Sequence, residues 1–265
     1  MEGFAQLLHR AALLRHRLVG RALRSDRVRQ PAALCLAIHG NLSVLQGRRL
    51  EGLIRKSHFL VLRFEGFDLA VSPAPAATLE LAAPEDADPV SLAFALEFGD
   101  ENPVELRCLV GRTRGAPLAW LIASGDWRSV PGLHTSGVDV QDRRFTPERL
   151  ASLLKHSGET ARALILSHRA LDSLGPEDAD TVLIEAGIHP GAPSRSLSRD
   201  EAFRLHAAIA RLVQAALDSA EAERPPPAPA RLATCPRCGG ELRSLAQRAG
   251  EARLCPRCQP PRGRR

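Results

Sequence analysis

Near its C-terminus the chain carries Cys235-Pro236-Arg237-Cys238 and, after sixteen further residues, Cys255-Pro256-Arg257-Cys258. Each Cys-x-x-Cys pair can present two thiolates from one tight turn, and Zn²⁺ in structural sites takes four such ligands in a tetrahedron. Gly239, Gly240 and Gly250, between the pairs, suit the turns of a hairpin. We therefore predict a structural zinc site that leaves no open coordination position. A dithiol redox pair is the alternative.

Length and composition indicate a globular protein of one large domain or two ordinary ones. The 265 residues are 44% hydrophobic, which is enough for real cores and excludes wholesale disorder. The formal net charge is +6, and every basic residue except Lys56 and Lys155 is an arginine. Arginine binds phosphate through a planar fork and stacks on bases, so its excess favours a nucleic-acid partner. GC-rich codon usage would produce the same excess.

The rest of the composition concerns the compartment. Cys35 and Cys108 lie in apolar runs and are expected to be buried free thiols. No apolar run approaches the roughly 20 residues of a membrane span. The N-terminus has the pattern of an amphipathic helix with arginines, which differs from that of a signal peptide. We expect a cytoplasmic protein without membrane contact.

The spacing of apolar residues predicts a helix over 4–18, ended by Gly20, and then a change of pattern. Short apolar runs follow, separated by breaks that contain Gly, Pro and Asp, and they predict an antiparallel sandwich of six to eight strands. These runs are 32–40, 58–64, 67–71, 77–82, 91–98, 104–110 and 117–123.

From Thr146 the chain is predicted to be helical, because Thr, Pro and Glu in succession mark a helix start. Ser198 and Glu201 have the spacing of a capping box. The expected helices cover 149–156, 163–174, 176–186 and 199–221, and a proline-rich linker covers 224–229.

The predicted fold class is α+β: an N-terminal helix and an antiparallel β-sandwich, then a helical domain and a four-cysteine zinc hairpin. The predicted boundaries are 1–130, 140–224 and 232–262.

This order of elements resembles the formamidopyrimidine-DNA glycosylase / endonuclease VIII family of base-excision DNA repair proteins. The resemblance rests on the wording CPRC and CPRCQ of the hairpin, which ends in Gln259, and on Ala186-Gly187-Ile188-His189-Pro190, which matches the family's helix–two-turn–helix. Leu18-Val19-Gly20-Arg21 and Val138-Asp139 fit as well. The resemblance implies a two-domain, zinc-containing protein that grips bent double-stranded DNA, everts a damaged base, cuts its glycosidic bond and nicks the backbone.

The catalytic residues that the resemblance implies are changed at the N-terminus. The family uses the amine of an N-terminal proline, followed by glutamate, to form a Schiff base with the sugar. This chain begins Met1-Glu2-Gly3. In one register Met1 replaces the proline, and its α-amine, with a pKa of about 8, is the candidate nucleophile beside Glu2. In the other register Glu2 replaces the proline and no amine is left.

The DNA contacts that the resemblance implies are changed too. His58 stands where the family has a phosphate-contacting lysine, and Lys56 lies two residues earlier, on the same face of the expected strand. Gly175-Pro176 replaces the Gly-Asn of the helical turn, and Gly250 replaces the catalytic arginine of the hairpin. The family's wedge loop has no counterpart around 71–75. The predicted DNA-binding residues are Lys56, His58, Gly175, Arg195, Arg248 and Arg253.

Three functions are compatible with these changes. The first is a monomeric relative of the DNA glycosylases that binds damaged, abasic or distorted DNA at the nucleoid, with lost or altered chemistry. The second is an active glycosylase that uses the Met1 amine or a water activated by Glu2. The third is a regulatory or interaction module whose zinc hairpin contacts protein or RNA. Changed catalytic positions in an intact zinc frame favour the first.

Overall fold

The structure is a computed structural model that describes residues 4–36, 41–72, 77–110, 117–134, 137–172, 174–222, 233–248 and 250–261. These residues form two compact units. Unit 1 contains 10–134, and unit 2 contains 4–9 and the chain from 137 onward. Whether 140–224 and 232–262 fold as separate domains stays a prediction.

Helix α1 (Phe4–Leu18) has the predicted bounds. Its apolar residues at helical spacing, among them Ala11, Leu14 and Leu18, are buried. The basic residues of its last turn interact favourably with the negative end of the helix dipole. Gly20 follows at φ +86, a conformation that glycine adopts without strain, and turns the chain into the first strand.

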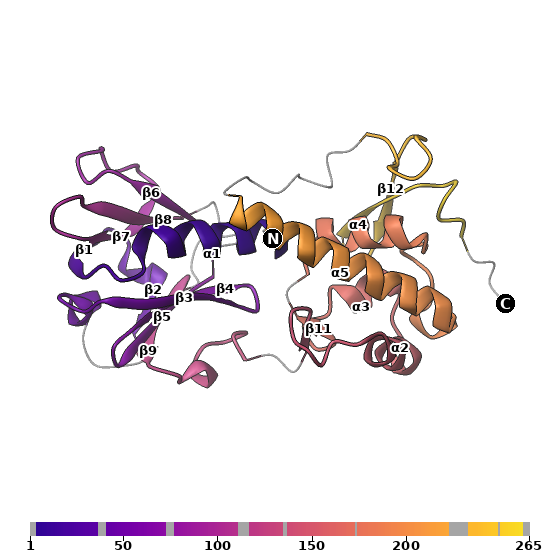
Figure 1. Cartoon of the computed structure of the whole chain (residues 1–265), viewed down its shortest axis with the longest axis horizontal. Helices are drawn as coiled ribbons and strands as arrows, with labels where there is room; N and C mark the ends of the chain where they lie inside the picture. The colour runs from indigo at the N-terminus through magenta and orange to yellow at the C-terminus, as the bar shows by residue number, and fades with distance from the viewer. Residues whose placement is uncertain are drawn as a thin grey trace. The chain divides into compact units, whose positions relative to one another are not determined.

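Unit 1 is a sandwich of two sheets (Figure 1). One sheet is antiparallel throughout and has the order β1 (Leu23–Val28), β7 (Leu92–Phe98), β8 (Val104–Val110), β6 (Ala77–Ala82). The other has the order β2 (Leu34–Leu36), β9 (Ala119–Ala123), β5 (Phe67–Val71), β4 (Phe59–Phe64), β3 (Leu50–Lys56). Phe64 and Phe98 stack between the sheets with ring centroids 6.3 Å apart. The predicted sandwich is confirmed, with two corrections: the described residues form nine strands in place of the predicted six to eight, and β2 pairs with β9 in parallel.

Three details of the sandwich differ from the expectation. Strands β1 and β3 are not among the predicted runs. Strand β1 was missed because it is largely polar. Its Arg27 bonds to Asp88 and to the buried Glu105, so ion pairs hold this strand where apolar packing does not. The run 32–40 forms the short 3₁₀ helix η1 (Pro31–Ala33) and then β2, and 37–40 lie outside the described residues.

The two cysteines outside the zinc pattern are free thiols, as expected. Cys108 is buried in β8, and burial raises the pKa of its thiol to about 12, so it stays protonated and unreactive. The expected burial of Cys35 is wrong, because this thiol is partly exposed on the short strand β2.

Unit 2 is built on helices. They are α2 (Pro147–His156), α3 (Ala161–Ile165), α4 (Pro176–Ala186) and α5 (Arg199–Glu221). The last of these packs against α2 and α4 (Figure 1). The capping box is confirmed: Ser198 Oγ accepts from Glu201 N–H, and Ser198 N–H donates to the Glu201 carboxylate at 2.8 Å.

The helix predicted over 163–174 is wrong. Helix α3 ends at Ile165, and the chain later forms β11 (Leu171–Asp172), which pairs in parallel with β10 (Val138–Asp139). Val138 N–H also donates to Ala170 O at 3.1 Å. Pairing with a distant segment therefore overrides the local helical spacing.

The remaining elements are short. They are the 3₁₀ helices η2 (Leu42–Leu45), η3 (Trp127–Ser129) and η4 (Ser194–Ser196), and the hairpin strands β12 (Arg243–Gln247) and β13 (Gly250–Leu254). The predicted linker 224–229 lies outside the described residues. Within the described part of the chain, no helix combines the length and apolar character needed to cross a membrane.

Candidate functional site

The four cysteines of the two knuckles converge on one point in unit 2. Their sulfur atoms all lie within 4.8 Å of one another. The Sγ atoms of Cys235 and Cys258 are 3.9 Å apart, and those of Cys238 and Cys255 are 3.6 Å apart. Tetrahedral zinc with Zn–S bonds of about 2.3 Å requires S–S distances of about 3.8 Å. The residues therefore fit one Zn²⁺ held by four thiolates.

Each knuckle is shaped by backbone hydrogen bonds. Cys235 N–H donates to Gly240 O at 2.7 Å, and Gly239 N–H donates to Cys235 O at 2.8 Å. In the second knuckle, Cys258 N–H points at Cys255 Sγ at 3.4 Å, which stabilises a thiolate. The Sγ–Sγ distances between the two knuckles are 3.6 and 3.9 Å. The geometry therefore favours a metal site shared by both knuckles over a redox pair within one Cys-x-x-Cys.

Gln259 joins the second knuckle to the turn that follows α4. Its side chain is buried. The Oε1 atom accepts from Cys255 N–H at 2.7 Å, and Nε2 donates to Ile188 O at 2.7 Å. Gln259, the last residue of the CPRCQ motif, therefore docks the zinc hairpin on the Gly187–Pro190 segment.

Gly187 lets the first knuckle approach the same turn. It caps the C-terminus of α4 at φ +69. A Cβ atom at this position would overlap Arg237 Nη1 and would lie 3.4 Å from Cys258 O. The Arg237 guanidinium therefore lies over the end of α4, where the helix dipole favours a positive charge.

We expect Gly187→Ala to destabilise unit 2 by about 1–2 kcal/mol, because the positive φ strains a side chain and Arg237 must move. Urea denaturation monitored by circular dichroism measures the effect. Gly158→Ala is the control, since its Cβ would meet nothing within 4 Å and its φ is not positive. Equal midpoints for both variants would contradict the role given to Gly187.

The hairpin turn lies beside the helical turn. Arg248, exposed, follows β12 directly, and Gln247 pairs with Gly250, the first residue of β13. A Cβ at Gly191 would lie 3.3 Å from Gln247 Nε2. Exposed Arg195 lies in η4, further along the same helical turn. The structure thus places Gln247, which precedes the predicted Arg248, beside Gly191, which lies four residues before the predicted Arg195.

The other two predicted residues of unit 2 make contacts within the chain. Arg253, half-buried on β13, donates its backbone N–H to Asp180 at 2.8 Å. Gly175 is buried at the N-cap of α4, and its N–H donates to Asp178 Oδ2 at 2.8 Å. The same oxygen accepts from Phe4 N–H at 2.6 Å. The Gly175 amide is therefore already satisfied inside unit 2.

In unit 1, Lys56 and His58 do not share a strand face as expected. Lys56 is the last residue of β3 and pairs with Phe59, so His58 lies in the tight turn between β3 and β4. The alternation of faces ends with the strand, which is why that expectation fails. Buried Ser57 adopts φ +54, which is uncommon for a residue other than glycine, and its Oγ is 3.1 Å from His58 Nδ1. The His58 ring lies against Phe59, with centroids 4.3 Å apart.

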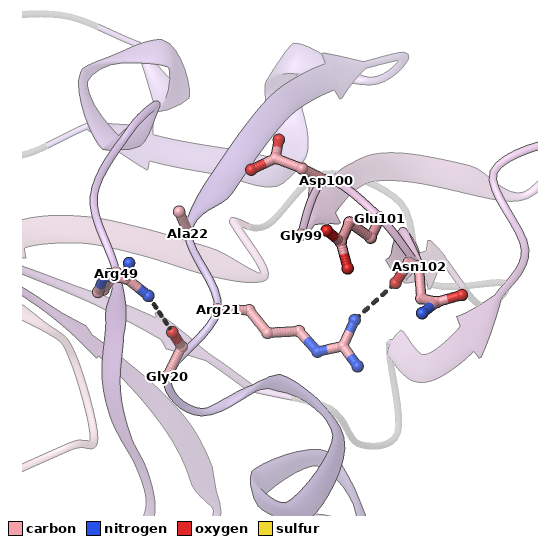
Figure 2. A pocket seen from close by; sticks show the side chains of 8 residues that line it. All are labelled: Gly20, Arg21, Ala22, Arg49, Gly99, Asp100, Glu101 and Asn102. Carbon is pink, nitrogen blue, oxygen red and sulfur yellow. Dashed lines mark hydrogen bonds between the residues drawn. The ribbon is translucent and has the colours of Figure 1, made fainter.

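A hollow in unit 1 surrounds Arg21, one of the residues that carry the resemblance (Figure 2). Arg21 Nη1 donates to Asn102 O at 2.6 Å, and Arg49 Nη1 donates to Gly20 O at 2.8 Å. The lining also contains Asp100 and Glu101, so positive and negative groups balance. The two arginines thus tie the Gly20 corner to neighbouring segments.

The comparisons with known proteins agree with this geometry. No family model matches the chain. The formamidopyrimidine-DNA glycosylase of Chloroflexus aggregans is 31% identical over 174 residues, covering 65% of this chain and 61% of that protein. The enzyme of Brevibacillus brevis is 33% identical over 131 residues, covering 49% and 47%. These two matches span less than two thirds of each relative. The formamidopyrimidine-DNA glycosylase of Symbiobacterium thermophilum is 27% identical over 270 residues, covering 92% of this chain and 84% of that protein.

Solved structures show the same fold. Lactococcus lactis formamidopyrimidine-DNA glycosylase, bound non-covalently to DNA containing an abasic site, aligns with a TM-score of 0.82 at 19% identity, covering 98% of this chain and 100% of that one. The MutM (Fpg) protein of Thermus thermophilus aligns with a TM-score of 0.80 at 24% identity, covering 97% and 98%. The chain is thus similar in sequence to formamidopyrimidine-DNA glycosylases, in one case over 92% of its length, and it has the fold of their solved structures.

Some family positions are not described by the structure. Met1 and Glu2, the predicted catalytic residues, lie outside the described residues, as does most of the wedge segment 71–75. His189 of the helical turn has a structural contact, since its Nδ1 accepts from Gly191 N–H at 3.1 Å. Burial lowers the pKa of His189, which favours this neutral form.

Proposed function

We propose that this protein is a monomeric, cytoplasmic DNA-binding protein that recognises damaged, abasic or distorted duplexes, and that the glycosylase and lyase chemistry of its family is lost or altered. One observation carries the proposal. The zinc hairpin is complete and docked on the helical turn through Gln259, while Gly250 occupies the place that the resemblance assigns to a catalytic arginine. A preserved frame with a changed catalytic position favours binding over cleavage.

The charge of the hairpin region supports DNA as the partner. Arg195 in η4 and Arg248 directly after β12 are both exposed. Exposed guanidinium groups bind phosphate through charge-assisted, often bidentate, hydrogen bonds. The structural neighbour from Lactococcus lactis is itself bound to DNA that contains an abasic site. Binding to a similar duplex is therefore the first activity to test.

The N-terminus of α4 supports altered chemistry. In the family, the resemblance places a phosphate at the Gly-Asn of this turn. Here the Gly175 N–H is taken by Asp178, and Pro176 has no N–H to donate. Glu177 and Asp178 add negative charge to the first turn. These features disfavour a phosphate at this point, so Gly175 is the weakest of the predicted DNA contacts.

DNA binding is tested by fluorescence anisotropy with a duplex that carries an abasic-site analogue, over a range of salt concentrations. We expect tighter binding than to the undamaged duplex and a steep loss of affinity with salt. Arg248→Ala should lower the salt slope by about one. Arg211→Ala, an exposed arginine of α5 paired with Glu185, is the matched control and should leave the slope unchanged.

Cleavage is tested by borohydride trapping on the same DNA with a natural abasic site. We expect binding without a covalent complex. A complex that disappears when the N-terminal amine is blocked would instead establish the active glycosylase that uses Met1. Absence of DNA binding, with binding to RNA or protein, would establish the interaction module.

A further inference from the structure

A buried ion pair in unit 2 connects the helices to the zinc hairpin. Arg162 of α3 is 0% exposed and Asp180 of α4 is 6% exposed. Arg162 Nε donates to Asp180 Oδ1 at 2.7 Å. A guanidinium buried to this extent must have its N–H groups satisfied by the chain, and the neighbouring contacts show how.

Both members of the pair also bond to the backbone of β13. Arg162 Nη2 donates to Glu251 O at 2.8 Å. Asp180 Oδ2 accepts from Arg253 N–H at 2.8 Å. A longer contact of 3.5 Å joins Arg162 Nη1 to Gly250 O. The ion pair thus holds the part of β13 nearest to the hairpin turn.

These bonds are the ones that a third strand would make with the outer edge of β13. In an antiparallel ribbon, the C=O of one residue and the N–H of the residue two further along point to the same outer edge. Glu251 O and Arg253 N–H are such a pair on β13, whose other edge faces β12. The guanidinium supplies the donor and the carboxylate supplies the acceptor that a third strand would offer.

The two ends of the hairpin therefore have different anchors. The cysteines and Gln259 fix its base, next to Ile188. The ion pair fixes the end that carries the turn, where Arg248 follows β12. A two-stranded hairpin is only marginally stable by itself in water. Without the ion pair, the end that carries the turn would therefore be free to move about the zinc knuckles.

We propose that Arg162 and Asp180 are positioning residues for the DNA interface: by completing the outer edge of β13 they fix the direction in which the hairpin turn presents Arg248. The proposal rests on the proposed function, since the direction of Arg248 matters only if the hairpin meets DNA. Neither residue contacts DNA itself in this scheme, because both are buried.

The test compares the full-length protein with the double variant Arg162→Met, Asp180→Leu. Replacing both charges by apolar groups of similar volume avoids an unpaired buried charge, so the variant is expected to fold. It removes the side-chain donor to Glu251 O and the side-chain acceptor of Arg253 N–H, while all four cysteines are intact. We expect one zinc per chain, and affinity for the abasic-analogue duplex lower by about tenfold, the effect of one lost charge-assisted contact.

The decisive comparison is a double-mutant cycle with Arg248→Ala. If the pair acts through Arg248, this substitution weakens binding in the wild-type background and has little further effect in the double variant. Full additivity, or wild-type affinity of the double variant, would overturn the proposal. A role in stability alone would not make the effects of Arg248→Ala depend on the background.

Hydrogen exchange gives a readout that does not need DNA. In the zinc-loaded double variant we expect the amide of Arg253 to exchange at least about tenfold faster, since its acceptor is gone and local opening is easier. Unchanged protection would overturn the proposal.

If the wild type binds no DNA, the proposed function fails, and this measurement still decides whether the pair holds the hairpin. Should the double variant not fold, Asp180→Asn, which keeps an acceptor for Arg253 N–H but lacks the charge, is measured in its place and is expected to exchange faster than wild type.

Discussion

Cys255→Ser is expected to abolish zinc binding. It should also reduce the affinity for the abasic-analogue duplex to the affinity for an undamaged duplex. Cys255 is the most buried ligand of the candidate site. Its N–H bonds to Gln259, and its sulfur faces Cys238 at 3.6 Å and accepts from Cys258 N–H. A serine hydroxyl is a poor zinc ligand compared with a thiolate.

The size of the effect follows from the small core of the hairpin. Its buried apolar residues, Leu242, Ala252 and Leu254, are too few to hold two short strands without the metal. Structural zinc contributes an apparent free energy of about 10–16 kcal/mol to small zinc-binding peptides. Loss of one ligand should therefore disorder the hairpin, while helices α2–α5 keep their own core.

Metal content by atomic absorption and binding by anisotropy measure this prediction. We expect one zinc per chain in the wild type and none in the variant, with a nearly unchanged helical circular dichroism signal. Cys35→Ser is the control, because this free thiol lies far from the knuckles in sequence and belongs to unit 1. Retention of one zinc and of full DNA affinity by Cys255→Ser would refute a four-thiolate site.

The features that could be predicted from the sequence are those set by neighbouring residues. The bounds of α1, the Ser198–Glu201 capping box and the left-handed cap at Gly187 all depend on residues within about one helical turn. The convergence of the four cysteines follows from their spacing, because each knuckle is a local turn. Such features depend little on how the rest of the chain folds.

The features that were missed depend on distant segments. Arg162 and Asp180 have the appearance of surface charges on amphipathic helices, yet strand β13, nearly 90 residues beyond Arg162, buries them. Strand β1 is polar and is held by ion pairs to segments some 60 to 80 residues away. No local pattern marks such partners. The predicted run 58–64 included His58, whereas β3 ends at Lys56 and β4 begins at Phe59, so His58 lies in the hairpin turn between them.

Asp178→Asn is expected to remove a pH dependence from the stability of unit 2. Asp178 is 1% exposed, and burial raises the pKa of its carboxyl from 3.8 to about 6, although the Phe4 and Gly175 N–H groups that it accepts pull the pKa down. Both N–H groups bond to the same oxygen. An asparagine carbonyl can therefore accept both bonds without carrying a charge.

The sign follows from proton linkage. Because the pKa is higher in the folded state than in the unfolded chain, the folded state retains the proton as the pH rises from about 4 to 6. Over this window Asp178 loses a stabilising contribution, and above it an ionised carboxylate remains buried. A shift of about two pKa units corresponds to about 3 kcal/mol. The stability of Asp178→Asn relative to wild type should therefore rise by up to that amount between pH 4 and pH 7.

Urea denaturation at pH 4, 5, 6 and 7 on both proteins measures this difference, and subtraction removes the contributions of all other titrating groups. Glu177→Gln is the matched control, because it removes the neighbouring carboxylate from the same helical turn while leaving Asp178 in place. The control should retain most of the pH dependence, since the Glu177 charge is the smallest cause of the raised Asp178 pKa. A difference between Asp178→Asn and wild type that stays constant with pH would mean that the carboxyl has the same proton affinity folded and unfolded. In that case burial at the junction of α1 and α4 would not perturb it.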